Sequence, residues 1–571
     1  MRKGNIFLLL VCFMFGIYST AFSQPVDSTS LGGGNITTTV NLNSGTKYIM
    51  KGFNYVKNGG KVVIQPGTII YGDSSSRATL IIERGGKLIA DGTASQPIVF
   101  TSRKGNQGGS LGRLPGDWGG IIILGRSGIN TSSGADSAEI EGFGAGLGPI
   151  YGGQPRIDDD SSGVLRYVRI EFPGVNLTPT SGNEINGLTM GGVGSKTIIE
   201  HIQVSYCGDD SFEWFGGTVN CKWLISYKPI DDDWDTDNGF RGRVQFGLSV
   251  RDTSFHDQST SNGFESDNNN NSPSNYNSPR TKPLFCNMTV IGPYINTGLT
   301  LHPDWNSRGG HLRRRTLTCI YNSIIMGWRV GMRLDECGVI NAANGDTLQQ
   351  RSNVYAGNVK LADTASNSGC TSFSTHAWLQ TGAYNNTIFS TASSVQLNNP
   401  FGVYPYGPEG PIVNHWMPMA GSPVLTGANF TYPNISSGFD VVTYRGAFGG
   451  PGTNWTEAWA VFNPVTYIIG IQQISSQVPA KFSLEQNYPN PFNPVTNIKF
   501  AMPKAGFASI TIYNTLGEVV TTLVNRQLNI GTYKVDFDGA NLSSGAYFYR
   551  LNVKTENNFE WTESKKMMLV K

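Results

Sequence analysis

Short stretches of alternating apolar and polar residues recur along most of the chain, and one of them is written twice in succession. Residues 201–206 (HIQVSY) match residues 222–227 (KWLISY) 21 positions later, and an acidic segment follows each. Strand-forming residues at alternate positions, repeated after about 20 residues with Gly and Asp at the corner, are typical of one coil of a β-solenoid. Such a coil buries its inward face only by stacking on others. The match predicts that Val204 and Ile225 both point inward.

The same strand pattern continues on both sides of this stretch. Residues 168–174 match residues 202–208, and residues 287–292 match residues 322–327. The spacings are unequal, which indicates conserved strands with loops of different length at the corners. A two-sheet sandwich also contains short alternating strands. Its strands have no reason to recur as similar sequences in one order, so the pattern favours a right-handed parallel β-helix in an all-β protein.

The first third of the chain is expected to supply further short strands. Residues 61–71, 79–90 and 98–102 are apolar and β-branched, with Gly pairs and Pro-Gly or Asp-Gly steps between them. From about residue 398 the periodicity fades. We therefore expect a β-helix body over residues 24–471, whose irregular C-terminal cap closes the end of the solenoid, and a linker over residues 472–480.

The first 23 residues are predicted to be a secretory signal peptide. Arg2 and Lys3 precede an apolar run over residues 6–17, and Ala21 and Ser23 are the small residues of a cleavage site. No later run approaches the roughly 18 apolar residues that a membrane helix needs, so no transmembrane segment is predicted.

Composition changes this picture little. The chain has 71 Gly, 23 Tyr, 29 Phe and 11 Trp, and only 15% of its residues are charged, as expected of an exported β protein. Its 43 basic and 41 acidic residues nearly cancel, so nothing suggests a nucleic-acid partner. Once the signal peptide is removed, the remaining cysteines allow up to three disulfides or serve as small buried apolar residues; these cysteines are Cys207, Cys221, Cys286, Cys319, Cys337 and Cys370.

Acidic residues gather at the corners of the expected coils. The corners contain Asp158, Asp159 and Asp160, then Asp209 and Asp210, and then Asp231, Asp232, Asp233, Asp235 and Asp237. Clustered carboxylates suit Ca²⁺, a hard ion that takes six to eight oxygen ligands. Asp232, Asp233, Asp235 and Asp237 are the candidate calcium ligands, although the EF-hand pattern fails because Val244 stands where a bidentate Glu is required. Turns in which Asp side chains accept backbone N–H bonds are the alternative.

An aromatic residue is repeatedly paired with an acid beside these corners. The pairs are Trp214 with Glu213, Trp234 with Asp235, and Phe264 with Glu265. Stacked coils would align them as a strip along one face, where rings can stack on sugars while the acids accept hydroxyl groups. This predicts a glycan-binding strip. The alternative is that the rings form a core ladder and the acids cap the turns.

Two resemblances follow from longer motifs. The run GGKLIADGTASQPIVFTS resembles the opening coils of exported right-handed β-helix proteins. The segments GDWGGIIILG, NEINGLTMGGVGS, GDDSFEWFGGTV and YRGAFG are similar to a family of bacterial surface proteins of unassigned function. This resemblance covers most of residues 45–460 and implies a fold and a location, not an activity.

An enzyme is the rival hypothesis, because β-helices also host pectate lyases and polygalacturonases. Asp209, Asp210, Asp235 and Asp237 offer carboxylates for acid–base work. The rest of those catalytic sets does not follow, since the sequence after His311 lacks the second glycine and no Arg-x-Lys comes at suitable spacing. No catalytic residue is therefore assigned.

Residues 481–571 have a different composition and are expected to form a small β-sandwich. The segment closely resembles the C-terminal sorting domain of type IX secretion cargo, through motifs that end with paired lysines; the motif residues are Pro489, Asn490, Pro491, Phe492, Asn493, Pro494, Gly517, Gly545, Tyr547, Lys565 and Lys566. The resemblance implies handling by the type IX machinery and its sortase-like peptidase in a Gram-negative cell, with export to the surface or the medium.

The sequence thus predicts a secreted or cell-surface protein with a β-helix body. The leading hypothesis is a binding, adhesin-like or structural surface module that contacts extracellular glycans. The alternative is a polysaccharide-degrading lyase or glycoside hydrolase on the same scaffold. An enzyme should gather carboxylates and a basic residue in one place, whereas a binder should spread aromatic residues along a face.

Overall fold

The structure is a computed structural model of the chain. It describes residues 31–571 apart from residues 105–112, 144–145, 177–184, 258–259, 271–273, 297, 299–306, 366–369, 371, 403–413, 463, 465–471, 476, 529, 540–541 and 556–558. The predicted signal peptide lies outside the described residues.

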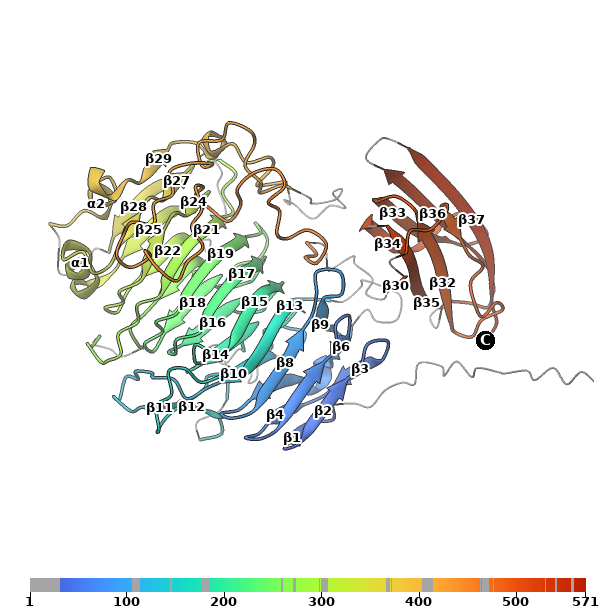
Figure 1. The fold of residues 1–571 in the computed structure, drawn as a ribbon, viewed down its shortest axis with the longest axis horizontal. Helices are drawn as coiled ribbons and strands as arrows, with labels where there is room; N and C mark the ends of the chain where they lie inside the picture. Colours follow the sequence, from blue (N-terminus) through green and yellow to red (C-terminus); the bar gives the residue numbers. More distant parts are fainter. Residues whose placement is uncertain are drawn as a thin grey trace, which may run out of the picture.

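The body is a parallel β-helix made of two long sheets (Figure 1). Sheet 1 has 11 strands, each paired in parallel with the strand of the next coil. In spatial order they are β1 (Gly34–Ile36), β4 (Phe53–Val56), β7 (Thr79–Ile82), β10 (Gly120–Leu124), β14 (Leu188–Gly191), β16 (Phe212–Phe215), β18 (Trp234–Asp237), β20 (Asn262–Ser266), β22 (Arg308–Leu312), β25 (Val330–Leu334) and β28 (Lys360–Thr364).

Sheet 2 has 16 strands and supplies the remaining sides of each coil. Its main path is β2 (Thr39–Leu42), β5 (Lys61–Ile64), β8 (Lys87–Asp91), β13 (Gly163–Glu171), β15 (Ile198–Ser205), β17 (Asn220–Tyr227), β19 (Arg243–Val250), β21 (Leu284–Ile291), β24 (Ile324–Met326), β27 (Val354–Ala356) and β29 (Thr387–Phe389). Off this path lie β3 (Lys47–Met50), β6 (Ile69–Gly72), β9 (Ile98–Ser102), β23 (Cys319–Tyr321) and β26 (Gln350–Arg351). The strands expected over residues 61–71, 79–90 and 98–102 are confirmed.

Inward residues of both sheets form one continuous apolar core. Aromatic rings dominate its middle, where Phe212 stacks on Trp234 and Trp214 stacks on Phe240, with ring centroids 5.2 and 5.3 Å apart. Trp214 and Trp234 are both fully buried. Each coil therefore buries its inward face only against its neighbours, as expected of a solenoid.

The long strands of sheet 2 bend at one residue in the left-handed conformation, and this bend sets the register. Tyr167, His201 and Trp223 have φ of 50°, 55° and 57°, and their rings stack at centroid distances of 4.2 and 4.5 Å. The coil spacing here is 22 residues, because Ile202 pairs with Leu224. The spacing of 21 residues predicted from the sequence is wrong by one residue.

The corrected register changes which residue points inward. Leu224 and Val204 belong to the interior core, whereas Ile225 pairs with Gln203 and is buried on the outer side of sheet 2. The prediction is thus confirmed for Val204 and wrong for Ile225. The other two sequence matches are confirmed, because Val168 pairs with Ile202 and Thr289 pairs with Ile324.

Residues 397–402 and 414–462, which we call the cap, lie over the outer face of sheet 2. They share an apolar cluster with the strands, which includes Trp459 and Ile225. Side-chain amides of the sheet bind the cap's main chain: Gln203 bonds Val461 in both directions at 2.7 and 2.9 Å, and Asn287 donates to the carbonyl of Tyr444 at 2.9 Å. The described residues of the cap form no helix or strand, and they pack on a side of the solenoid, whereas the sequence predicted a cap over its end.

Short helices that the sequence did not predict lie near the last coils. α1 (Glu336–Asn344) and α2 (Thr375–Leu379) bury Val339, Ile340 and Trp378 against the interior core. Cys337 and Cys370 form a disulfide, and the other four cysteines of the described residues are free and buried. The remaining short elements are η1 (Ser74–Ser76), η2 (Gly382–Tyr384), η3 (Ala392–Val395) and the antiparallel pair β11 (Ser137–Glu139) and β12 (Ile150–Gly152).

The C-terminal domain is a sandwich of two four-stranded antiparallel sheets. One sheet contains β30 (Gln472–Ser475), β35 (Gly531–Asp538), β32 (Val495–Met502) and β31 (Ser483–Leu484); the other contains β34 (Val519–Leu528), β33 (Gly506–Tyr513), β36 (Gly545–Thr555) and β37 (Glu560–Leu569). β30 lies within the expected linker, so the domain begins earlier than its sequence indicated. No helix among the described residues is long and apolar enough to cross a membrane.

Candidate functional site on the outer face of sheet 1

The outer face of sheet 1 changes from apolar to charged along the solenoid. In the first coils Ile81 and Ile122 point outward and pack with Ile140 and Tyr151 of the β11–β12 region. From β16 onward the same strand position carries an ionisable side chain. The register stacks these residues into one line, which we call the outer row: Glu213, Asp235, Glu265, His311, Arg333 and Asp363.

The predicted aromatic–acid strip is in register, but its two halves face opposite sides of the sheet. Successive strand residues point to opposite faces. Trp214, Trp234 and Phe264 are fully buried in the interior core, while Glu213, Asp235 and Glu265 belong to the outer row. The three rings therefore cannot stack on a sugar, and the prediction of an aromatic glycan-binding strip is wrong in that respect.

A second line of polar residues lies at the turn that leads into each strand of sheet 1. The backbone N–H of Asp232 donates to Asp210 Oδ1 at 2.7 Å, and the backbone N–H of Asn262 donates to Asp232 Oδ1 at 2.5 Å. Asn262 in turn pairs with Arg308. We call this line, which also contains Asn186, the turn row. Each acid caps the coil after it, as the alternative for the acidic corners expected.

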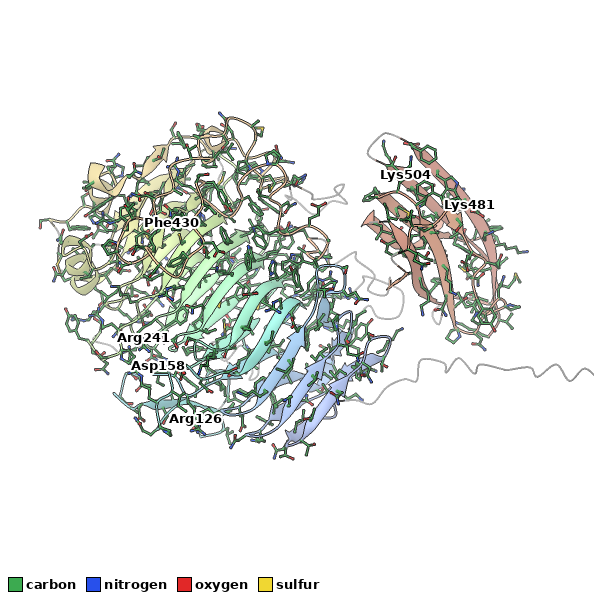
Figure 2. All side chains as sticks on the ribbon, viewed as in Figure 1. Arg126, Asp158, Arg241, Phe430, Lys481 and Lys504 are labelled. Carbon is green, nitrogen blue, oxygen red and sulfur yellow. A yellow bond between two sulfur atoms is a disulfide. The ribbon has the colours of Figure 1, made fainter. Side chains whose placement is uncertain are left out.

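The corner at Asp158 is neutralised by arginines. Arg156 bonds the Asp158 carboxylate at 2.6 Å, and Arg241 lies 3.3 Å from it (Figure 2). The Arg156 hydrogen bond lowers the pKa of Asp158 well below its ordinary value. This corner therefore needs no additional cation.

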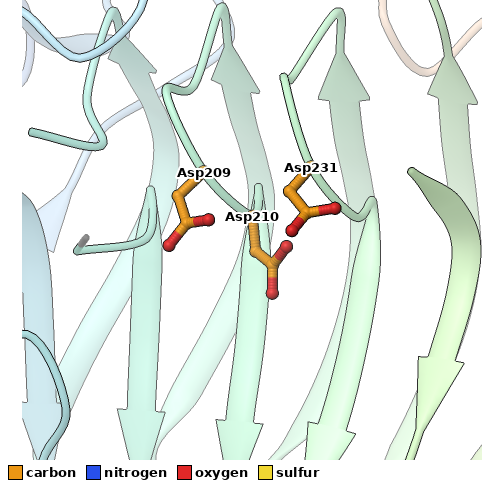
Figure 3. Close-up of side chains that lie close together, drawn as sticks. All are labelled: Asp209, Asp210 and Asp231. Carbon is orange, nitrogen blue, oxygen red and sulfur yellow. The ribbon is translucent and has the colours of Figure 1, made fainter. Parts of the chain in front are cut away.

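The corners at Asp209 and Asp231 bring carboxylates of two neighbouring turns together. Figure 3 shows Asp209 and Asp210 from one turn beside Asp231 from the next. Their closest oxygens lie within 4.8 Å of one another, and the same holds for Asp210, Glu213 and Asp235 and for Asp232, Asp235 and Glu265. The three groups overlap, so carboxylates from neighbouring coils form one continuous acidic cluster.

The four predicted calcium ligands do not converge on one point. Asp232 and Asp235 lie in the acidic cluster together with Glu265. Asp233 points to the other side of the turn, where it accepts a hydrogen bond from Ser226 at 2.5 Å and faces Arg251 at 3.8 Å. Asp237 accepts the backbone N–H of Asn238 at 2.6 Å. Two of the four predicted ligands thus lie in the cluster, and the calcium prediction did not include Asp210, Glu213 and Glu265 as their partners.

Burial and mutual repulsion dominate the electrostatics of this cluster. Burial, followed by the charge of Asp232, raises the pKa of Asp210 well above its ordinary value. Burial, followed by the charge of Glu141, raises the pKa of Glu213 in the same way. Burial, followed by the charge of Glu265, raises the pKa of Asp235. Burial also raises the pKa of Asp237 to about 7 and that of Asp233 to about 6. Removing charge from water without pairing it is costly, so this cluster favours a bound proton or cation.

Basic residues dominate the next coils of the same face. Arg313 bonds both Glu265 and Asp267, with 2.9 Å between Arg313 Nε and Asp267 Oδ1. Burial alone would raise the pKa of Glu265, but Arg313 beside it lowers that pKa to about 2. His311 Nε2 lies 2.7 Å from Asp335, and its Nδ1 lies 3.7 Å from Glu265. Carboxylates, a histidine and an arginine thus meet at one place.

Arg308 of this face forms no ion pair with a described residue, although the charges of Asp363, Glu265 and Asp335 act on it from a greater distance. Its residue is 7% exposed, and its Nε has no hydrogen-bond partner among the described residues. Nη1 lies 3.4 Å from His311 Nδ1, and Arg333 nearby lowers the pKa of Arg308 further after burial. Sequence reasoning set His311 aside because the second glycine after it is lacking. It missed Arg308, because the coil from β20 to β22 is long and the inserted loop hides its match to the other coils.

The comparisons with known proteins agree with the fold. A family model described as a pectate-lyase-like β-helix domain matches residues 34–396, which is more than half of the chain. The chain belongs to this β-helix family. The family match spans both sheets and the whole outer row, and it carries no assignment of binding or degradation to this chain.

A second family model, described as a secretion system C-terminal sorting domain, matches residues 486–568. The protein is therefore exported by type IX secretion to the cell surface or the extracellular space. Within this domain Phe492 and Tyr547 belong to the core, and Gly517 has φ of 80° in the β33–β34 turn. Asn490 accepts the backbone N–H of Met568 at 2.9 Å. The other motif residues lie before β32, at the start of β36 and on β37; they are Pro489, Pro491, Asn493, Pro494, Gly545, Lys565 and Lys566.

No curated protein matches the chain. Among solved structures, the chain is similar to full-length tailspike protein 2 from Escherichia coli O157:H7 bacteriophage CAB120, with 11% identity and a TM-score of 0.13. The alignment covers 91% of this chain and 64% of the tailspike chain, so the chain spans less than two thirds of that protein's length.

Proposed function

We propose that the body of this exported protein binds a polysaccharide that carries acidic groups, along the outer face of sheet 1 from Glu265 to Asp363. The observation that carries this proposal is the state of Arg308. It is a nearly buried guanidinium with no ion-pair partner among the described residues. A buried charge without a partner is costly unless a ligand supplies the opposite charge.

The surroundings of Arg308 support an anionic ligand on an extended surface. Arg333 Nε lies 3.4 Å from Asp335 Oδ2, and Arg333 Nη1 lies 3.5 Å from Asp363 Oδ1. Arg333 lies in the coil next to His311. Guanidinium groups are well suited to carboxylate and sulfate groups because they donate through two parallel N–H bonds. A row that continues over several coils suits a chain-like ligand held by repeated contacts.

Depolymerisation of the same ligand is the second candidate function. The observation that favours it is His311, whose Nε2 is fixed by Asp335 at 2.7 Å while Nδ1 faces Glu265 beside Arg313. A histidine oriented by a carboxylate is suited to proton transfer. The sequence analysis expected an enzyme to gather carboxylates and a basic residue in one place. The surroundings of His311 have this arrangement.

The test is a glycan array of neutral and acidic polysaccharides with the mature protein, together with assays for unsaturated and reducing-end products. We expect binding to acidic polysaccharides, weakened at least about tenfold by Arg308→Gln, because the loss of a charge-assisted contact costs about 1.5–3 kcal/mol. Arg329→Gln is the matched control, since Arg329 is exposed on a neighbouring corner.

The outcomes separate the two candidate functions. Binding that is unaffected by Arg308→Gln places the ligand elsewhere and contradicts the proposal. Release of product that is abolished by His311→Asn, with binding retained, assigns degradation as well. Silence on the array and in both assays contradicts both functions.

For the C-terminal domain we infer that its motif residues are what the export machinery and its sortase-like peptidase recognise. Asn490, Asn493 and Lys566 are exposed, so substituting them should leave the sandwich folded. We expect a chain lacking residues 481–571 to remain in the periplasm. The variant that carries Asn490→Ala, Asn493→Ala and Lys566→Ala should be exported poorly. Normal surface display of the truncated chain would contradict this inference.

A further inference from the structure

A lysine and an aspartate form a buried pair at one corner of the solenoid, and the proposed function does not use it. Lys228 follows β17 directly, and Asp252 stands two residues after β19, in the next coil. Their side chains are 3% and 0% exposed, and Lys228 Nζ lies 2.7 Å from Asp252 Oδ2. Among the ion pairs that lysines form with described residues, this is the only one in which both partners are buried.

Aromatic rings enclose the amine of this pair. The ring centroids of Tyr227 and Tyr206 lie 5.3 and 6.0 Å from Lys228 Nζ. Both tyrosines are buried, and the rings of Phe462 and Phe255 meet them edge-on. Two charges in such surroundings have lost their hydration, and their mutual attraction offsets that cost only in part. A reaction that removes both charges is therefore favoured here.

The carboxyl group of Asp252 is held in a position that suits attack by the amine. Its Oδ1 accepts the backbone N–H of Ser254 at 2.7 Å. Its Oδ2 lies beside Lys228 Nζ, yet it accepts no well-directed hydrogen bond from the described residues. The amine thus meets the carboxyl group away from the line of a hydrogen bond and close to the carbon Cγ. Well-oriented groups within one molecule react as if at concentrations of about 10⁵–10⁸ M.

We propose that Lys228 and Asp252 condense to an intramolecular isopeptide bond that joins two successive coils. One proton passes from the ammonium group to Oδ2, which leaves a neutral amine and a carboxylic acid. The lone pair of Nζ then attacks Cγ, and the N–H of Ser254 stabilises the negative charge that develops on Oδ1. The bond between Cγ and Oδ2 breaks, and Oδ2 leaves as water with a second proton from Nζ. One amide and one water molecule replace the two charged groups, and no oxidant or other reactant is needed.

The bond fastens the corner at which the chain leaves sheet 2 for sheet 1. The two coils are in register there, because the backbone N–H of Lys228 donates to the carbonyl of Val250 at 2.9 Å. A covalent tie between residues 228 and 252 also restricts the unfolded chain, which stabilises the folded state. The modification acts on the stability of the exported solenoid and does not depend on the proposed glycan.

Mass spectrometry of the wild-type protein tests the proposal without any variant. Trypsin cleaves after Lys and Arg except before Pro, so an unlinked chain gives residues 223–241 and 252–280 as separate peptides. We expect one branched peptide instead, lighter than the sum of the two by one water molecule, with fragmentation placing the branch at Lys228 and Asp252. Recovery of both linear peptides at full mass overturns the proposal. Loss of water from the Asp252 peptide without branching overturns it as well, because that product is a cyclic imide.

The same digest contains a matched control. Lys104 Nζ lies 2.6 Å from Asp117 Oδ1, but the Lys104 side chain is 45% exposed. Its ammonium group stays hydrated, so we expect no branched peptide from this pair. Branching there as well would show that such bonds form during digestion and would contradict the proposal.

The variant Lys228→Arg separates the covalent bond from an ion pair. Arginine keeps the positive charge at this corner but does not form the amide. We expect linear peptides from this variant and a melting temperature below that of the wild type, since the unfolded chain regains the freedom that the bond removes. Linear peptides from both proteins, with equal melting temperatures, would identify the pair as an ion pair only and contradict the proposal.

Discussion

The two sheets of the β-helix share one interior but differ in their outer faces. On sheet 2 the outward residues are mainly apolar or carry amides, and they include the buried ion pair of Arg169 and Glu171. The cap covers them through Trp459 and through bonds from Gln203 and Asn287. On sheet 1 the outward residues from Glu213 onward have ionisable side chains. Inward positions are constrained by packing in every coil. Outward positions are not constrained in this way. The chemistry of this solenoid therefore depends on the side chains of its two outer faces.

The largest expected effect is on the covered face. Trp459→Ala removes a buried ring that packs in the cluster between cap and sheet 2. We expect a loss of about 3–5 kcal/mol in the free energy of unfolding, the usual cost of deleting a buried Trp. Denaturant unfolding followed by circular dichroism measures it. The exposed cap residue Met419 is the control, and a cost for Trp459→Ala as small as for Met419→Ala would mean that the cap is not integral.

The next prediction distinguishes residues of the interior core from residues on the outer face of sheet 2, which the cap covers. Leu224→Ala and Ile225→Ala should each cost about 2–5 kcal/mol, because both side chains are fully buried. Only Ile225 shares a cluster with Trp459. In double-mutant cycles with Trp459→Ala we therefore expect coupling of about 0.5–3 kcal/mol for Ile225 and additivity for Leu224. The reverse result would restore the 21-residue register.

A smaller effect is expected on the pH dependence of stability, through His201 on the outer face of sheet 2. Burial, followed by the charge of Arg166, lowers the pKa of His201 to about 4 from 6.5. Its neutral form is favoured in the folded state, so its contribution to stability is present above pH about 6.5 and is lost as the pH falls toward 4. His201→Phe keeps a ring in the stack with Tyr167 and Trp223. Melting temperatures should fall less on acidification in this variant, and an identical pH profile would contradict the assignment.

The smallest effect is expected at the open end of the charged face. Lys360 and Asp363 lie 3.4 Å apart, and the Lys360 side chain is 58% exposed. Exposed ion pairs contribute about 0–1 kcal/mol. Lys360→Ala should therefore leave the melting temperature nearly unchanged. A large loss would show that the outer row is a structural network.

The fold was predictable from the sequence because stacking repeats the same strand pattern, whereas the register was not. The match of Ser205 and Tyr206 with Ser226 and Tyr227 pointed to a spacing of 21 residues. The left-handed bend at His201 and Trp223 fixes 22 instead. No local pattern marks such a bend, since a φ above zero is unusual for His and Trp and is imposed here by the packing of the coil.

The candidate site was predictable only in part for a related reason. The sequence identified Asp232 and Asp235 at their turn, and it recognised the repeated acid in Glu213, Asp235 and Glu265. It did not separate the inward rings from the outward acids, although strict alternation within a strand contained that signal. Asn186 and Arg308 join the site across long inserted loops, and only the pairing of the coils brings them into line.

The cap also has a consequence for the order in which the chain is completed. It is the last part of the body in sequence, yet it bonds coils as far apart as those of Gln203 and Asn322, whose side chain accepts the backbone N–H of Asn429. Coils can wind one on another from the first onward, whereas the cap docks only when all of these coils exist. The sorting domain follows the cap in the chain, so the segment that fastens these coils together is the last part of the body to be completed in sequence.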